Sequence, residues 1–199
     1  MDRSLPLVTA PTAAPVRRDA ARNREALLAA ANALIAEGGV AALTMDAVAC
    51  RAGVGKGTLF RRFGTREGLM ATLLDESERR WQEAAMSGPP PLGPGAPARD
   101  RLLAFAGSRL EEHVRQDALI RAAGTTWGDN QSVIGFHVLH VRHLLLEAGI
   151  TGDATYPATV LVTMVSPPVL RQQLDAARLT PSRVLTGWTD LLDRLLPAD

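Results

Sequence analysis

The feature that most constrains the fold is a pair of short helical patterns separated by three residues, the first of which is a glycine. Residues 45–52 and residues 56–63 are each long enough for about two helical turns, and Gly53 lies between them. Glycine adopts the left-handed backbone conformation without a steric penalty, so Gly53 can end the first helix. Thr44 stands before that helix, where its hydroxyl can accept a hydrogen bond from an amide of the first turn. The spacing predicts a helix-turn-helix.

The composition favours an all-α fold. Hydrophobic residues make up 46% of the 199-residue chain, which supports a true core, whereas aromatic residues make up only 4%. Alanine and leucine abound and β-branched runs are scarce, a balance that favours helices over strands. Residues 1–70 contain ten Lys and Arg against six Asp and Glu, although the net charge of the whole chain is only +1. The basic N-terminal part is what a nucleic-acid partner would require.

The stretch AGVGKGTLFRRFGT, residues 52–65, has the glycines and basic residues of a phosphate-binding segment. A nucleotide-binding P-loop needs Ser or Thr directly after Gly-Lys and a glycine five residues before the second glycine. Here Gly57 follows Lys56, Cys50 takes the place of the first glycine, and no strand-like run precedes it. The P-loop interpretation therefore fails. The stretch lies on the second helix of the pair, which such proteins insert into the major groove, so the phosphate it would contact belongs to DNA.

The sequence LTMDAVACRAGVGKGTLFRRFGTREGL resembles the DNA-binding region of the TetR family of bacterial transcriptional repressors. Five elements of this sequence recur in that family in the same order. They are a threonine before the second helix, an Ala-Gly-Val turn, a Gly-Thr-Leu-aromatic run, a later phenylalanine and a basic-Glu-x-Leu segment. The matching residues are Thr44, Ala52-Gly53-Val54, Gly57-Thr58-Leu59-Phe60, Phe63 and Arg66-Glu67-Gly68-Leu69. Including the first helix, the resemblance covers about residues 22–70. It implies a repressor that acts as a homodimer on a palindromic operator in double-stranded DNA.

The resemblance also implies a set of DNA contacts. Base edges are expected to meet Lys56, Thr58 and Arg61. The DNA backbone is expected to meet Thr44, Gly57, Phe60, Arg62 and Arg66. This chain departs from the family pattern at three positions. Gly55 replaces the usual capping Ser or Thr, Phe60 replaces the commoner tyrosine, and Arg62 stands where histidine is frequent.

The chain divides into a small basic part and a larger helical part. We expect a disordered tail over 1–17, a DNA-binding domain over 18–64, a connecting helix over 65–86, a Pro/Gly-rich loop over 87–100 and a ligand-binding and dimerisation domain over 101–199. In the last of these, helices are expected over 101–115, with a short piece to 123, and over 132–148, 156–177 and 181–196. Ser166-Pro167-Pro168 interrupts the third, predicting a kink or two short helices.

The larger part offers candidates for two functions. The residues expected to bind a small hydrophobic organic effector are Phe105, Arg121, Trp127, Phe136, His137 and Met164. The same residues also suit a plain hydrophobic core, and that alternative stays open. The residues expected to form the dimer interface are Leu185, Trp188, Leu192 and Leu195. The dimer is expected to form through the last two helices, because they have more apolar positions than one side of a terminal helix needs.

Several other functions find little support. His137 and His140 share a helical face but no carboxylate is placed beside them, so partly buried or solvated histidines are favoured over a metal site. No base or nucleophile accompanies the scattered aspartates, and no cofactor or catalytic activity is expected. The single cysteine, Cys50, suits a reducing compartment. No signal peptide or membrane-spanning run is evident, so a cytoplasmic location is expected.

Two alternatives to a ligand-released repressor remain. One is a DNA-binding dimer that is constitutive, its helical part serving dimerisation alone. The other is a helical enzyme or metal-dependent protein with a vestigial helix-turn-helix. An enclosed cavity would favour an effector, whereas turnover or bound metal would favour the second alternative.

Overall fold

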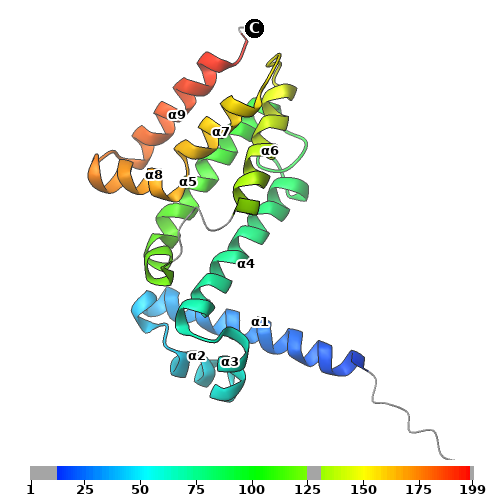
Figure 1. Ribbon diagram of the computed structural model, residues 1–199, viewed down its shortest axis with the longest axis vertical. Coiled ribbons are helices and arrows are strands. Elements are labelled where there is room, and N and C mark those ends of the chain that lie inside the picture. Colours follow the sequence, from blue (N-terminus) through cyan, green and yellow to red (C-terminus); the bar gives the residue numbers. More distant parts are fainter. Residues whose placement is uncertain (1–12, 125–130, 198–199) are drawn as a thin grey trace, which may run out of the picture. The chain divides into compact units, whose positions relative to one another are not determined.

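The structure is a computed structural model that describes residues 13–124 and 131–197, and these contain helices and no strand (Figure 1). The all-α expectation is thereby confirmed. The chain divides into two compact units, with the boundary between Arg66 and Glu67. Within the described residues, no helix combines the length and the apolar character that crossing a membrane requires.

The N-terminal unit is built from three helices and a short 3₁₀ turn. They are α1 (Ala13–Gly38), the turn Val40–Ala42, α2 (Met45–Ala52) and α3 (Lys56–Phe63). Helix α1 packs on α2, and α2 packs on α3. The buried apolar side chains of the three helices are Leu27, Leu28, Ala30, Ala31, Val48, Ala49, Leu59 and Phe63. Both short helices have the bounds expected from the sequence.

Local hydrogen bonds explain where these helices begin and end. Thr44 Oγ1 accepts a hydrogen bond from the amide of Ala47 at 3.1 Å, as expected of an N-cap. Gly53 adopts φ +67°, and the amide of Val54 then donates to the carbonyl of Ala49 at 3.1 Å. This is a Schellman C-cap, which reverses the chain within two residues. The predicted role of Gly53 is confirmed.

The expectation of an unstructured tail through residue 17 is wrong for residues 13–17, because α1 already begins at Ala13. The first four amides of a helix have no partner within it, so Pro15 in the first turn removes no hydrogen bond. Ala13 and Ala14, which precede Pro15, favour the helical conformation. Residues 1–12 lie outside the described part.

The C-terminal unit consists of helices packed around one apolar core. They are α4 (Arg66–Ser87), whose first residue belongs to the N-terminal unit, α5 (Ala98–Ala123), α6 (Gln131–Glu147), α7 (Thr155–Met164), α8 (Pro167–Arg171), a π-helical turn (Gln172–Ala176) and α9 (Pro181–Leu195). Helix α6 packs on α5 and α7, and α5 also packs on α8 and α9. Trp81, Phe105, Leu144, Leu161 and Trp188 are among the largest core side chains.

Two sequence expectations for this unit need correction. Helix α5 is continuous to Ala123, whereas a break after residue 115 was expected. Arg109 and His113 lie on its buried face, and these polar residues interrupt the apolar pattern without interrupting the helix. The Pro/Gly-rich loop is also shorter than the expected 87–100, because Ser87 still belongs to α4 and residues 98–100 already belong to α5.

The break at Ser166-Pro167-Pro168 produces two helices, one of the two outcomes expected. Helix α7 ends at Met164, and Ser166 occupies the N-cap position of α8 with an extended backbone. Its side chain makes no capping hydrogen bond. Proline is suited to the first turn of α8, where its missing amide has no partner to lose.

Trp188 anchors α9 to the rest of its unit. Its side chain is only 3% exposed, and its indole Nε1 donates a hydrogen bond to the carbonyl of Leu161 on α7 at 3.0 Å. Leu192, one turn further, is fully buried. Both side chains are therefore packed within the single chain, and their expected place in an apolar seam between subunits stays a prediction.

We predict that Trp188→Ala lowers the free energy of unfolding by about 3–5 kcal/mol, because it leaves a cavity and an unpaired carbonyl. Urea unfolding followed by far-UV circular dichroism measures this. Tyr156→Ala is the control, since Tyr156 is 76% exposed. Equal stability of the two variants would contradict the assignment of Trp188 to the core.

Candidate functional site

Helix α3 has two chemically different faces. Leu59 and Phe63, four residues apart, are buried against the N-terminal unit. Lys56, Phe60 and Arg61 lie on the exposed side. Phe60 is 48% exposed, which is unusual for an aromatic side chain in a small domain. The exposed side of α3 therefore combines positive charge with an accessible aromatic ring.

The beginning of α3 has an open backbone. Gly55 occupies the N-cap position and makes no side-chain capping hydrogen bond, as its replacement of Ser or Thr implied. Gly57 is exposed, and a Cβ atom at this position would meet nothing within 4 Å. Amides at a helix N-terminus attract anions because they lack partners and carry the positive end of the helix dipole. A phosphate can approach this backbone without steric hindrance.

Two expected base-reading residues make contacts within the chain. Lys56 Nζ lies 2.7 Å from Asp46 Oδ2 of α2, and both side chains are largely exposed. An exposed ion pair of this kind contributes little free energy, so Lys56 can exchange Asp46 for another acceptor. Arg61 Nη2 lies 3.4 Å from Thr58 Oγ1, at the long limit of a hydrogen bond.

Arg66 is placed differently from the other expected contacts. Its Nε donates to the carbonyl of Leu43 at 2.6 Å, and its Nη2 donates to the carbonyl of Val40 at 2.7 Å. These bonds join the first residue of α4 to the turn that precedes α2. Arg66 thus holds Thr44, the next residue after Leu43, in position. A direct contact of Arg66 with DNA stays a prediction.

One ion pair in this unit escaped the sequence analysis. Arg51 on α2 makes two hydrogen bonds to the carboxylate of Glu37 on α1, at 2.7 and 2.6 Å. The hydrogen bond from Arg51 lowers the pKa of Glu37, and the pKa of Arg51 is raised in return. The two residues are fourteen positions apart and on different helices. Only the packing of α1 on α2 brings them together.

Three of the six expected ligand residues form one aromatic cluster in the C-terminal unit. Phe105, Phe136 and His137 gather around Trp81, with ring centroids 5.6, 6.4 and 4.9 Å from its ring. His140 lies parallel to Phe136 at 6.1 Å. The rings pack against one another, as the alternative of a plain core implied.

A buried ionic network borders this cluster, and the sequence analysis did not identify it. Glu78 on α4 pairs with Arg109 on α5 at 2.9 Å and accepts a hydrogen bond from His137 Nε2 on α6 at 2.9 Å. The guanidinium of Arg109 also lies 5.1 Å from the centre of the Trp81 ring, a cation–π geometry. Glu78 thereby links three helices. Its partners are 31 and 59 positions away, so no local pattern indicates them.

These contacts decide the protonation of the network. Burial alone would raise the pKa of Glu78, but the hydrogen bond from His137 and the charge of Arg109 together lower it to about 2. Burial lowers the pKa of His137, mainly because a charged imidazole would lose its hydration. At neutral pH, Glu78 and Arg109 are therefore charged and His137 is neutral.

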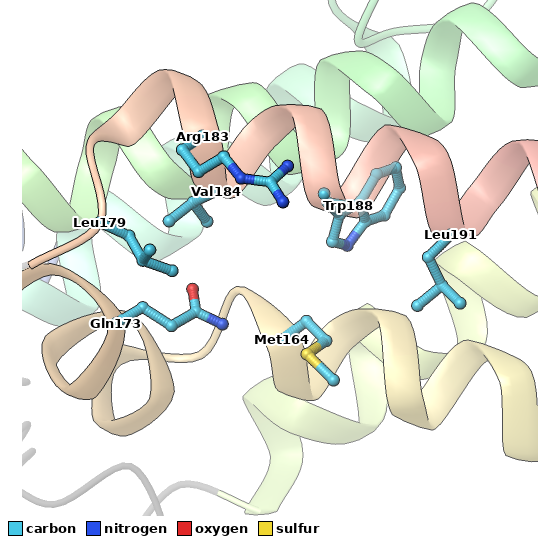
Figure 2. Close-up of a pocket in the computed structure, with 8 residues that line it drawn as sticks. Met164, Gln173, Leu179, Arg183, Val184, Trp188 and Leu191 are labelled. Carbon is cyan, nitrogen blue, oxygen red and sulfur yellow. The ribbon is translucent and has the colours of Figure 1, made fainter. Parts of the chain in front are cut away.

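The remaining expected ligand residues lie elsewhere. Arg121 pairs with Asp117 on its own helix and, at 3.2 Å, with Asp175 of the π-helical turn. Met164 is 39% exposed and lines a surface groove beside α9 (Figure 2). Trp127 lies outside the described residues. The structure thus does not gather the described five into a single pocket, because α7 turns Met164 away from the aromatic cluster.

The other expectations concern metal ions and the dimer. Across residues 13–124 and 131–197, no group of three His, Cys, Asp or Glu residues has the arrangement of a metal site. His143 lies 3.3 Å from Glu147 on the surface. Leu185 and Leu195 are half-buried against the core of the single chain. Their role in dimerisation stays a prediction.

Comparisons with known proteins agree with this geometry. The family model described as bacterial regulatory proteins, tetR family, matches residues 27–73, which include all of α2 and α3. Residues 27–73 are thus similar to the N-terminal region of that family. No curated protein matches the chain at a significant level.

Solved structures extend the TetR-like fold over most of the chain. A TetR transcriptional regulator from Rhodococcus sp. RHA1 is 21% identical, with a TM-score of 0.56 over 89% of this chain and 97% of that one. NalD, the secondary repressor of the MexAB-OprM multidrug efflux pump in Pseudomonas aeruginosa, is 18% identical, with a TM-score of 0.51 over 92% and 99%. Reduced E. coli NemR is 19% identical, with a TM-score of 0.54 over 88% and 98%. At these identities the likeness shows the fold.

We predict that Arg66→Ala destabilises the N-terminal unit by about 1–3 kcal/mol, because two part-buried carbonyls lose a charged donor. Hydrogen exchange of the α2 amides in the full chain measures the change. Arg61→Ala is the matched control, since Arg61 is exposed and has only a long contact with Thr58. Unchanged exchange in Arg66→Ala, together with weaker DNA binding, would instead make Arg66 a DNA contact.

We also predict that the C-terminal unit loses stability as the pH falls from 6.5 towards 4. Burial, followed by the charges of Arg101, His137 and His143, lowers the pKa of His140 from 6.5 to about 4. Between these values the unfolded chain binds the proton and the folded chain does not, so acid favours unfolding, by up to about 3 kcal/mol. His140→Phe should reduce this pH dependence in urea unfolding. His143→Gln removes only the last-listed of these causes and should change the pH dependence much less than His140→Phe does. Equal slopes in all three proteins would contradict the assignment.

Proposed function

We propose that this protein is a transcriptional repressor that binds a palindromic operator as a homodimer and is released by a small organic ligand. The observation that carries the DNA-binding part is the exposed surface of α3, which presents Lys56, Phe60 and Arg61 and begins at an N-cap without a side-chain hydrogen bond. This helix is the second of a helix-turn-helix within a TetR-family domain. In such motifs the second helix enters the major groove.

The exposed residues of α3 and its neighbours are assigned to two kinds of DNA contact, with base edges or with the DNA backbone. Lys56, Thr58 and Arg61 are assigned to base edges. Gly57, Phe60 and Arg62 are assigned to the DNA backbone, together with Thr44, whose hydroxyl accepts a hydrogen bond from Ala47 and keeps its own proton to donate. Backbone contacts position the helix, and base contacts select the sequence. Arg66 acts in part by holding Thr44 in place.

The proposal of a homodimer rests on how little DNA one N-terminal unit can contact. One α3 contacts only a few base pairs. Two N-terminal units that bind symmetric half-sites about 34–36 Å apart together reach an affinity and specificity that one unit lacks. Leu185 and Leu195 on the outer side of α9 are the apolar positions assigned to the subunit contact. Both are only half-buried within the single chain.

Release by a ligand is supported by the kind of protein that shares this fold. NalD is a repressor of a multidrug efflux pump, and it aligns with 92% of this chain. A ligand can stabilise one spacing of the two N-terminal units of the dimer relative to another. A difference of about 1–3 kcal/mol in free energy would change the operator affinity several-fold or more. An amphiphilic organic molecule is the class that fits a helical domain with few polar groups.

A constitutive DNA-binding dimer is the second candidate, and one observation favours it. Phe105, Phe136 and His137, three of the residues assigned to the effector, pack against Trp81 and one another. An effector in this cluster would have to displace packed rings. The two candidates differ in a single measurement, which is whether any small organic molecule weakens operator binding.

We predict that Lys56→Ala weakens operator binding by about 1–3 kcal/mol and relaxes the preference at one base pair in each half-site. Selection from random DNA, followed by fluorescence anisotropy on the selected site, measures both effects. Arg62→Ala is the matched variant, because it should lower the salt dependence by about one ion per subunit and leave base preference intact. An equal loss on every DNA sequence would make Lys56 a phosphate contact, and no salt-sensitive DNA binding by the unmodified protein would refute the proposed function.

A further inference from the structure

An ion pair joins the two helices of the helix-turn-helix where α3 begins. Lys56 Nζ lies 2.7 Å from Asp46 Oδ2, and the two side chains are 62% and 67% exposed. Asp46 belongs to the first turn of α2, and Lys56 is the first residue of α3. The pair therefore forms across the turn at Gly53, on a surface that water reaches.

Asp46 has a singular place in the sequence of the helix-turn-helix. Within residues 38–66 it is the one acidic residue, whereas the same stretch contains five basic residues, which are Arg51, Lys56, Arg61, Arg62 and Arg66. A carboxylate is unfavourable on a surface that approaches DNA phosphates, because binding there depends on positive charge. The single carboxylate of this stretch nevertheless lies against a lysine that the proposed function assigns to DNA.

The ion pair competes with any contact between Lys56 and DNA. A lysine ammonium is a compact charge with three donors, and its hydrogen bond to a carboxylate is charge-assisted. A phosphate or a base edge that takes the ammonium must replace the Asp46 carboxylate. Part of the free energy of the Lys56–DNA contact is therefore offset by separation of the pair.

We propose that Asp46 limits the affinity of the protein for DNA by holding the Lys56 ammonium, so that the ion pair is an autoinhibitory contact within the DNA-binding surface. Asp46 acts through Lys56 and is not itself a DNA contact. The inference rests on the proposed function, because it requires α3 to meet DNA. Since both side chains are exposed, the pair is weak enough to open when DNA arrives.

Two other roles of Asp46 predict different behaviour. A carboxylate in the first turn of a helix stabilises the helix through its dipole, and loss of that effect would not change how many ions the DNA releases. A carboxylate can also accept a hydrogen bond from the N4 amino group of cytosine, and loss of that contact would weaken operator binding. The salt dependence and the sign of the affinity change therefore separate the three roles.

The test measures binding of the full chain to a fluorescein-labelled duplex of random sequence, by fluorescence anisotropy at several salt concentrations, and repeats it with the selected operator. For Asp46→Asn we expect the affinity for both DNAs to rise about two- to fivefold per subunit at low salt, which corresponds to about 0.4–1 kcal/mol. We also expect a steeper salt dependence, by up to about one ion per subunit, because Lys56 then meets DNA without leaving an internal partner.

Glu37→Gln is the matched control, because Glu37 pairs with Arg51 in the same unit and Arg51 is not assigned to DNA. It removes the same charge and should change the affinity and the salt dependence much less than Asp46→Asn does. Asp46→Glu keeps the charge and should retain the weaker binding of the unmodified protein. In a Lys56→Ala background, Asp46→Asn should have no more effect than Glu37→Gln. Thermal unfolding checks that each variant is folded.

Three results would overturn the inference and leave the proposed function intact. Unchanged affinity and salt dependence in Asp46→Asn would restrict Asp46 to a structural role. Weaker operator binding would make Asp46 a base contact. A gain that persists in full in the Lys56→Ala background would show that the carboxylate repels DNA directly. If the unmodified protein shows no salt-sensitive DNA binding, the proposed function fails and this inference fails with it.

Discussion

The left-handed turn at Gly53 determines the direction of α3, and the chemistry of the N-terminal unit depends on that direction. The Schellman hydrogen bond from Val54 to Ala49 reverses the chain, so that Leu59 and Phe63 return to the core. The opposite side of α3 is then necessarily exposed. Lys56, Phe60 and Arg61 are exposed as a consequence of where the apolar side chains are buried.

The C-terminal unit uses buried charge in addition to apolar packing. Glu78, Arg109 and His137 belong to three helices, and each is largely removed from water. A buried ion pair contributes little net stability, because desolvation offsets the attraction, but loss of one partner leaves an unpaired charge. The network therefore favours one arrangement of α4, α5 and α6 over alternatives with similar apolar contacts. The cation–π contact with Trp81 joins it to the aromatic cluster.

Much of the N-terminal unit could be predicted from the sequence because its determinants are local. Thr44 and Gly53 mark the ends of α2 through a side-chain hydrogen bond and a left-handed turn that involve only neighbouring residues. The resemblance to the family makes the prediction of a helix-turn-helix more specific, because its pattern includes both the turn and the residues of α3. In the C-terminal unit the expectations held for helix content and for the break at Pro167, and they failed for the grouping of Met164 with Phe105. The apolar residues there share no feature that distinguishes a core position from the wall of a groove.

The sequence by itself determined the helical class, the bounds of α2 and α3, and the basic character of the N-terminal unit, because these depend on short-range hydrogen bonding and composition. Tertiary structure alone decided which side chains meet. The packing of the helices pairs Arg51 with Glu37 and lets Arg66 donate hydrogen bonds to two backbone carbonyls. It also buries Trp188 inside its own chain. Such pairings depend on how helices distant in sequence pack, and packing follows from the shape and volume of many side chains together. A local sequence pattern therefore does not predict these contacts.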